Sequence, residues 1–237
     1  MTEATTVTRW GTIQGREITF PMEVDSFNSA TLGFSVPSAA AAALLPGDAF
    51  EIVEIAPGLA QFIVSLVDYV ENPWGDYNEV NLGFLARPAG AGEEVIGSFV
   101  YRMPVDQEFT CQAGNEVMGF PKTVMGIDAD YSPSSVTFTL REGDEVAFTI
   151  TVPRAPAAGD PTRIEAVSYS YLDGAPYETP LAMDMATGMV EPGDVEFVVG
   201  TGPIADELRT LGMPSAPDFC AYGEGLSAVF QLGSAIK

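Results

Sequence analysis

One lysine stands out among the residues of this sequence that could do chemistry. Lys122 lies in the segment Gly114–Thr123, and the only other lysine of the 237-residue chain is Lys237. A lysine amine attacks a carbonyl group only when it is neutral, so burial or a nearby positive charge must lower its pKa from roughly 10.4 toward the working pH. Apolar neighbours such as Met118 and Phe120 favour burial, whereas most lysines are exposed. From the residues alone, an amine nucleophile and an exposed turn lysine are equally good interpretations of Lys122.

Two glutamates are candidates for proton transfer beside such an amine. Glu79 ends a polar, aromatic turn just before the apolar stretch Val80–Leu85, and Glu116 lies six residues before Lys122. A carboxylate within reach of an amine or a carbonyl can carry the protons that carbonyl chemistry moves. In a chain with 33 acidic residues, a solvated side chain is the more common role for either glutamate.

The composition excludes several other kinds of site. The chain has no histidine, which removes Ser-His-Asp and Cys-His catalysis and histidine metal sites. Its two cysteines, Cys111 and Cys220, match no zinc or redox spacing and are expected to be reduced and half-buried. No acidic cluster matches a calcium-binding loop. We therefore expect neither a metal nor a cofactor.

The formal charge of −23 limits the partners of the chain. A strongly acidic surface repels nucleic acids and anionic membranes, so we expect neither as a partner. An anionic substrate would need local positive charge or backbone N–H groups at its site. The N-terminus lacks the features of a signal peptide and no apolar run reaches about 18 residues, so a soluble cytoplasmic protein is the expectation.

Short apolar and alternating segments, separated by glycine and proline, predict a strand-rich chain. The expected strands are Ile18–Phe34, Phe50–Ile55, Gln61–Val67, Val80–Leu85, Val95–Met103, Ala166–Leu172, Leu181–Met189, Asp194–Val199 and Phe219–Leu232, with a β-hairpin over Val136–Val152. A helix is expected over Ser38–Leu45 with Ser38 as its N-cap, and a second over Ala205–Leu211. The prediction is an α+β chain with a strongly curved antiparallel sheet or β-barrel core and two or three short helices. It forms one domain over residues 1–237, with residues 1–16 as an N-terminal arm or edge strand.

The segment around Lys122 resembles a motif of a known family. Gly114-Asn115-Glu116-Val117-Met118-Gly119-Phe120-Pro121-Lys122 is similar to the G-R-E-x-x-G-[FY]-P-K-K segment of the acetoacetate decarboxylase family. Tyr77-Asn78-Glu79 resembles the Y-x-E segment of that family. Further similar segments follow in the same order: Ala43–Pro46, Asp173–Pro176 and Thr201–Pro203. The resemblance spans about residue 25 to the end of the chain.

The resemblance implies a fold, a site and a reaction. The fold would be a cone-like, barrel-rich α+β fold that assembles into homo-oligomers. Lys122 would form a Schiff base with a small keto acid or ketone, and Glu79, with Glu116, would carry protons. Tyr77, Met118 and Phe120 would contact the substrate. The first reaction to expect is decarboxylation of an acetoacetate-like β-keto acid; aldol addition with dehydration through the same iminium is the alternative, and a non-catalytic protein that binds a small ligand is a third.

The sequence departs from the family at positions that matter for these alternatives. The second lysine of the motif, which would lower the pKa of the first, is Thr123 here, and the arginine of G-R-E is Asn115. The strand Val24–Phe34, where family decarboxylases carry an active-site arginine, has no basic residue. A second family glutamate aligns with Ile63. The residues for an imine are present, whereas much of the apparatus for a carboxylate is not.

Overall fold

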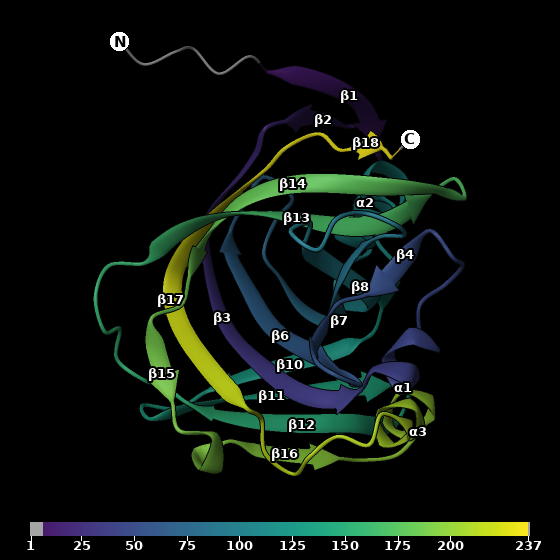
Figure 1. Ribbon diagram of the computed structural model, residues 1–237. Coiled ribbons are helices and arrows are strands. Elements are labelled where there is room, and N and C mark those ends of the chain that lie inside the picture. Colours follow the sequence, from purple (N-terminus) through teal and green to yellow (C-terminus); the bar gives the residue numbers. More distant parts are fainter. Residues whose placement is uncertain (1–6, 237) are drawn as a thin grey trace.

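The computed structural model describes residues 7–236, and its centre is a closed β-barrel (Figure 1). Neighbouring strands pair in an unbroken circuit that closes between the last and the first of them. In order around the barrel, the strands are β17 (Phe219–Phe230), β3 (Met22–Pro37), β6 (Leu59–Glu71), β7 (Tyr77–Pro88), β8 (Gly97–Val105), β13 (Thr162–Leu172) and β14 (Ala175–Met185). The predicted barrel core of a strand-rich α+β chain is confirmed.

A second antiparallel sheet covers one side of the barrel. Figure 1 shows it below β3 and β6, and its strands in order are β10 (Gly126–Tyr131), β11 (Ser135–Glu142), β12 (Glu145–Pro153) and β16 (Glu196–Val199). Side chains of both layers form one hydrophobic core, with Phe34 and Phe62 from the barrel and Phe138 and Phe148 from the second sheet. Burying this apolar surface is the main contribution that the second sheet makes to stability.

Successive side chains of a barrel strand point to opposite faces, one outside the barrel and one inside it. Along β3, Leu32 and Phe34 point outward into the core shared with the second sheet, whereas Ser29 and Thr31 point into the barrel. Along β6, Val64 points outward and the side chains on either side of it point inward. The strand pattern therefore separates a filled hydrophobic core outside the barrel from a cavity inside it.

The remaining strands are short, and two of them form a separate sheet. Thr8–Ile13 (β1) and Arg16–Phe20 (β2) form a hairpin, so the predicted N-terminal arm is a pair of strands from Thr8 onward; residues 1–6 of that arm lie outside the described residues. The remaining short elements are β4 (Phe50–Ile52), β5 (Glu54–Ala56), β9 (Lys122–Val124), β15 (Gly188–Val190), β18 (Ser234–Ala235) and a 3₁₀ turn, η1 (Pro192–Asp194). The predicted strand Phe50–Ile55 is divided at Val53, since β4 pairs with β7 and β5 pairs with β6.

The predicted hairpins and turns are largely confirmed. β11 and β12 pair around a turn at Gly143, as expected for Val136–Val152. β13 and β14 pair through Asp173 and Gly174, whose φ angles of 53° and 79° suit a tight two-residue turn. The predicted strand Leu181–Met189 is wrong in its bounds, because β14 ends at Met185 and β15 is a separate strand that pairs with β17.

Three α-helices occur within residues 7–236: α1 (Ser38–Ala42), α2 (Glu108–Met118) and α3 (Pro203–Thr210). The predicted helix over Ser38–Leu45 begins where expected but ends at Ala42, and Ser38 is not its N-cap. The N-cap position is Pro37, and the Ser38 hydroxyl donates a hydrogen bond to Glu54 instead. Helix α2 was missed in the sequence, because the residues Thr110, Gly114 and Asn115 are poor helix formers. None of these helices has the length and hydropathy that a bilayer span requires, within the part of the chain that is described.

Candidate active site

Lys122 is placed by the turn that ends helix α2. Gly119 adopts a left-handed conformation with φ of 64°, and Pro121 leads the chain into β9, where Lys122 pairs with Met103 of β8. An added Cβ at Gly119 would lie 2.4 Å from the carbonyl oxygen of Tyr171, so the turn requires glycine for both conformation and space. The Gly-Phe-Pro sequence therefore directs the lysine from the helix end into the barrel.

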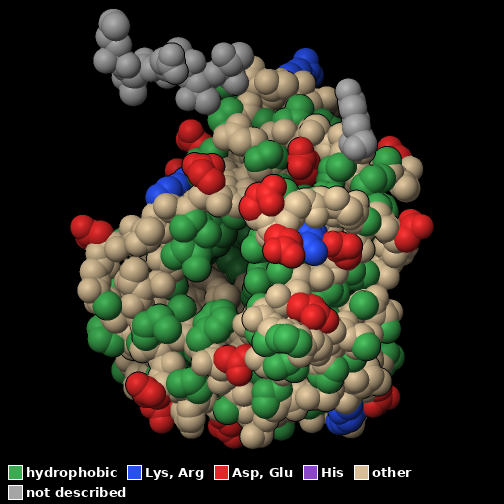
Figure 2. Space-filling model, viewed as in Figure 1, with side chains coloured by type: hydrophobic (Ala, Val, Ile, Leu, Met, Phe, Trp, Pro, Cys, Tyr) green, Lys and Arg blue, Asp and Glu red, His purple; other side chains and the backbone are tan. Residues whose placement is uncertain are grey.

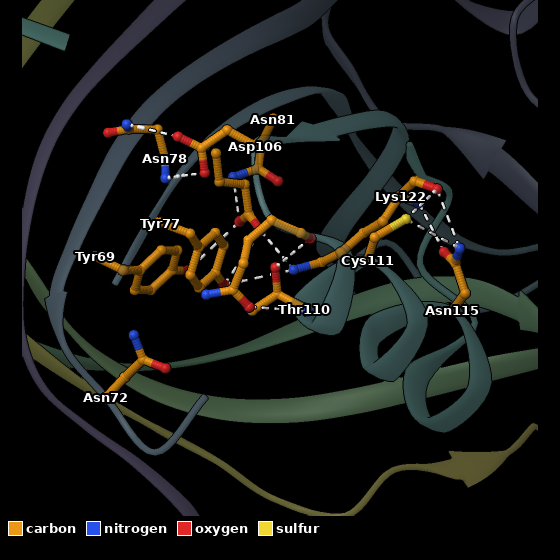
Figure 3. A network of polar contacts seen from close by, with 12 residues as sticks. Tyr69, Asn72, Tyr77, Asn78, Asn81, Asp106, Thr110, Cys111, Asn115 and Lys122 are labelled. Atoms are coloured by element: carbon orange, nitrogen blue, oxygen red, sulfur yellow. Dashed lines mark hydrogen bonds and ion pairs between the residues drawn. The ribbon is translucent and has the colours of Figure 1, made fainter. Parts of the chain in front are cut away.

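The backbone of Lys122 is held by helix α2. The Lys122 N–H donates to Asn115 Oδ1 at 2.8 Å, and Asn115 Nδ2 donates to the Lys122 carbonyl oxygen at 3.1 Å (Figure 3). The Cys111 thiol donates to the same carbonyl at 3.4 Å. Asn115 occupies the position of the arginine in the family motif, yet it fixes the nucleophile candidate through two backbone contacts.

The Lys122 side chain also packs against helix α2, at Gly114. An added Cβ at Gly114 would lie 2.6 Å from Lys122 Cδ and 2.7 Å from Cε. Real Cβ atoms do not make contacts this short. The Lys122 side chain therefore passes directly over Gly114, where a Cβ atom would collide with it. Gly114 thereby sets the direction in which the amine extends.

Replacing Gly114 with alanine is expected to displace the Lys122 amine and slow its reaction with ketones. A misplacement of about 1 Å costs roughly 100-fold in rate. Stability should change little, because alanine favours a helix over glycine by about 1 kcal/mol and offsets part of the overpacking. The measurement is the rate at which a ketone is trapped on Lys122 by borohydride. Gly126→Ala is the matched control, since its Cβ would come no closer than 3.4 Å to any neighbour. A wild-type rate in Gly114→Ala would show that this contact does not position the amine.

The Lys122 amine meets Glu79 inside the barrel. Nζ lies 2.6 Å from Glu79 Oε2, and the two side chains are 4% and 5% exposed. Glu79 lies near the start of β7, opposite Val67 of β6 and Val105 of β8. Buried charges are tolerated when they are paired and hydrogen-bonded, as this pair is.

Three polar side chains surround the Glu79 carboxylate. Tyr69 and Asn81 donate to Oε1 at 3.4 and 3.1 Å, and Tyr77 donates to Oε2 at 3.5 Å. Figure 3 labels these three donors. The rings of Tyr69 and Tyr77 stack with centroids 4.5 Å apart, and Lys122 Nζ lies 5.1 Å from the centroid of Tyr77. Burial, with the Glu79 charge as a further cause, raises the pKa of both phenols well above the ordinary value. Both tyrosines therefore stay protonated and act as hydrogen-bond donors.

A cavity of about 180 Å³ opens beside this pair. It offers about the room that one small organic molecule occupies. Its walls are mostly apolar, including Trp74, Met118 and Phe120, with hydroxyl and amide groups on the inward face of the barrel. Figure 2 shows a deep hollow with hydrophobic side chains along its walls on the face of the molecule that it presents.

The structure brings together five of the six residues predicted from the sequence. Lys122, Glu79, Tyr77, Met118 and Phe120 all line the cavity. The interpretation of the sixth, Glu116, is corrected: its side chain is exposed on the outer face of α2, where it accepts a hydrogen bond from Gln112 at 2.8 Å. A residue on that face does not reach the cavity.

Sequence reasoning missed Tyr69 and Asn81 as partners of Glu79. Asn81 follows Glu79 by two residues, so strand alternation places both side chains on the same face of β7. That signal was available in the sequence. Tyr69 comes from the neighbouring strand, and only the register of β6 against β7, which pairs Tyr69 with Tyr77, brings it to the carboxylate.

Residues 7–236 hold no group of three or more histidine, cysteine, aspartate or glutamate side chains arranged to bind a metal ion. The arrangement instead joins an amine, a carboxylate and two phenols at the wall of an apolar cavity. These are groups that can form an imine and move protons next to it.

Comparisons with known proteins agree with this arrangement. Residues 12–213 match the sequence profile of the family described as Acetoacetate decarboxylase (ADC). The chain therefore belongs to the acetoacetate decarboxylase family. No curated protein matches the chain in a direct sequence comparison.

Solved structures of the family share the fold at low sequence identity. Acetoacetate decarboxylase from Legionella pneumophila is 14% identical, with 92% of this chain and 87% of that chain covered and a TM-score of 0.64. An acetoacetate decarboxylase-like enzyme from Sphingomonas wittichii is 16% identical, with 91% and 93% covered and a TM-score of 0.57. The enduracididine biosynthesis enzyme MppR, complexed with the condensation product of pyruvate and imidazole 4-carboxaldehyde, is 14% identical, with 92% and 90% covered and a TM-score of 0.57. These structures therefore show the fold of this chain, and the profile match shows its family.

Proposed function

We propose that this protein is a Schiff-base-forming enzyme that makes or breaks a carbon–carbon bond next to a ketone. The observation that carries the proposal is the buried contact of 2.6 Å between Lys122 Nζ and Glu79 Oε2 at the wall of the cavity. The contact supplies both a nucleophile and a proton acceptor in one place. A lysine with no more than a structural role would have no need of a cavity beside its amine.

The pair offers a route to the neutral amine that does not require a second lysine. Transfer of one proton from Nζ to Glu79 Oε2 converts an ammonium and a carboxylate into a neutral amine and a carboxylic acid. Burial in an apolar cavity penalises charged groups, and this transfer removes both charges at once. Thr123, at the position of the missing lysine, is exposed and contributes no charge.

The neutral amine then adds to the carbonyl carbon of a ketone. The carboxylic acid of Glu79 returns its proton to the departing oxygen, and loss of water leaves an iminium and a carboxylate. The iminium accepts the electron pair of a bond that breaks at the adjacent carbon. Protonation of the resulting enamine and addition of water release the product and regenerate Lys122.

Two reactions fit this intermediate. Decarboxylation of a β-keto acid releases CO₂ and is the reaction expected from the name of the family. Aldol chemistry is the second candidate: the structure of MppR with a condensation product of pyruvate and an aldehyde supports it. The walls of the described cavity also hold no arginine that could bind a substrate carboxylate, which favours an aldol reaction of uncharged carbonyl compounds.

Borohydride trapping tests the shared intermediate. Incubation with a ketone or keto acid, for example acetoacetate or pyruvate with an aldehyde, should give a reduced adduct that peptide mass mapping assigns to Lys122. Release of CO₂ from acetoacetate would assign decarboxylation, and a condensed product would assign the aldol reaction. If no carbonyl compound is trapped on Lys122, the proposal is wrong and a ligand-binding role takes its place.

A further inference from the structure

We infer that the substrate of this site is an uncharged β-hydroxy ketone, or the ketone and aldehyde that condense to form it. This inference rests on the proposed iminium at Lys122 and adds the charge and polarity of the compound that the cavity accepts. The family name points to a keto acid, whereas the residues that line the cavity favour an uncharged compound.

The cavity holds one positive and one negative side chain, and they face each other. Among its described lining residues, Lys122 and Glu79 are the charged ones. The arginines of the chain lie elsewhere. Arg102, for example, binds Glu207 through two nitrogens at 2.6 and 2.7 Å, and Arg154 binds Glu224 at 2.6 and 3.0 Å. Arg16, the arginine near Trp74, donates to the Trp74 carbonyl and lies over the ring of Phe109 instead of lining the cavity.

Charge balance in the cavity then favours a neutral substrate. A ketone bound as an iminium contributes one positive charge, which the Glu79 carboxylate neutralises. A substrate carboxylate would add a second negative charge with no cation left to pair it. An unpaired buried charge costs several kcal/mol, and the net charge of −23 adds long-range repulsion of anions.

An unused acceptor beside Glu79 indicates a hydroxyl group on the substrate. Asn81 donates through Nδ2 to Glu79 Oε1, whereas its buried Oδ1 has no hydrogen-bond partner among the described residues. The opposite orientation of the Asn81 amide would place its Oδ1 against the Glu79 carboxylate, and two acceptors repel each other. Glu79 therefore fixes Nδ2 as the donor and leaves Oδ1 as the unpaired acceptor. A buried acceptor is stabilised by a donor such as an alcohol O–H, and a carboxylate cannot donate.

Other uncharged polar side chains line the cavity besides Asn81. Hydroxyl groups of Ser29, Thr31, Ser65, Ser98 and Ser168 line the cavity, and the last two lie 3.2 Å apart. Hydroxyl groups can both donate to and accept from a neutral alcohol or carbonyl, but they do not neutralise a carboxylate. The polar wall therefore matches a hydroxylated, uncharged ligand.

The reaction of such a substrate balances without any further reactant. Once the ketone is an iminium, the β-hydroxyl group turns its one proton from Asn81 Oδ1 to the adjacent Glu79 carboxylate, which takes it. The oxygen forms a carbonyl as the bond between the α- and β-carbons breaks, and the electron pair of that bond enters the iminium to give an enamine. An aldehyde leaves. Glu79 then protonates the enamine carbon, and water releases the ketone, so one β-hydroxy ketone gives one aldehyde and one ketone with no oxidation or reduction.

The test compares two ketones with the same carbon skeleton. 4-Hydroxybutan-2-one is uncharged and acetoacetate is an anion, and each is incubated with the full chain and borohydride at neutral pH. We expect trapping on Lys122 to be at least about 100-fold faster with the hydroxyketone, since an unpaired buried charge costs several kcal/mol. Formaldehyde should be released from the hydroxyketone in the absence of borohydride.

A variant of Asn81 separates recognition of the hydroxyl group from imine formation. Asn81→Leu removes the contact with Glu79 for both ketones, but only 4-hydroxybutan-2-one also loses a hydrogen bond to Oδ1, so its trapping should slow about tenfold more than the trapping of butan-2-one. Equal or faster trapping of acetoacetate in the wild-type protein, or absence of formaldehyde, would overturn the inference while the iminium at Lys122 stands. Failure of every ketone to be trapped would instead overturn the proposed function.

Discussion

Replacing Lys122 with methionine is expected to abolish trapping of any ketone inside the barrel and to reduce turnover to background. Removal of a covalent nucleophile from an enzyme costs on the order of 10⁶-fold in rate. Methionine keeps an unbranched apolar side chain of similar length, so it passes over Gly114 in the same way and fills the same space. The measurement is the mass of the borohydride-reduced protein, followed by peptide mapping.

The chain offers a matched control for this experiment. Lys237 is the only other lysine, so Lys237→Met removes the second ε-amine and should leave the adduct and the turnover at wild-type levels. An adduct that disappears in Lys237→Met and persists in Lys122→Met would show that the buried amine is not the nucleophile. Full turnover in Lys122→Met would lead to the same conclusion.

The sequence identifies Lys122 as the reactive amine, but it does not predict which residues surround that amine in the fold. The scarcity of lysine and the Gly-Phe-Pro-Lys motif identify Lys122, because both are properties of the chain itself. Its pairing with Glu79 depends on β7 and β9, which both pair with the end of β8 at Val105. Registers of strands far apart in sequence cannot be read from local patterns. The family resemblance supplied the glutamate where periodicity could not.

The misinterpretation of Glu116 follows from the missed helix α2. Once residues 108–118 are known to be helical, the buried face follows from Ala113, Gly114 and Val117. Glu116 then falls on the opposite face with Gln112, four residues earlier. The helix was missed because glycine and asparagine lower helix propensity. Those two residues occur there for the site: Gly114 gives room to the Lys122 side chain, and Asn115 binds the Lys122 backbone.

The buried pair should reduce the stability of the fold relative to an apolar replacement of the same shape. Glu79→Leu leaves the Lys122 amine without its ion-pair partner. Lys122→Met leaves the Glu79 carboxylate without its partner. Each single change is expected to lower the free energy of unfolding by about 3 kcal/mol, because it leaves an uncompensated buried charge. The double variant Lys122→Met, Glu79→Leu removes both charges and should recover the loss, reaching wild-type stability or exceeding it by about 1–4 kcal/mol.

Urea unfolding of the four proteins measures this cycle, with unchanged m-values as the check that folding stays two-state. Additive losses in the double variant would mean that the surrounding tyrosines and Asn81, and not the ion pair, hold the two side chains in place. A double variant at least as stable as the wild type, and inactive, would instead show that the pair is kept for chemistry at a cost in stability. That outcome is the one expected for two charges placed beside an apolar cavity, where a packed hydrophobic core would be the more stable choice.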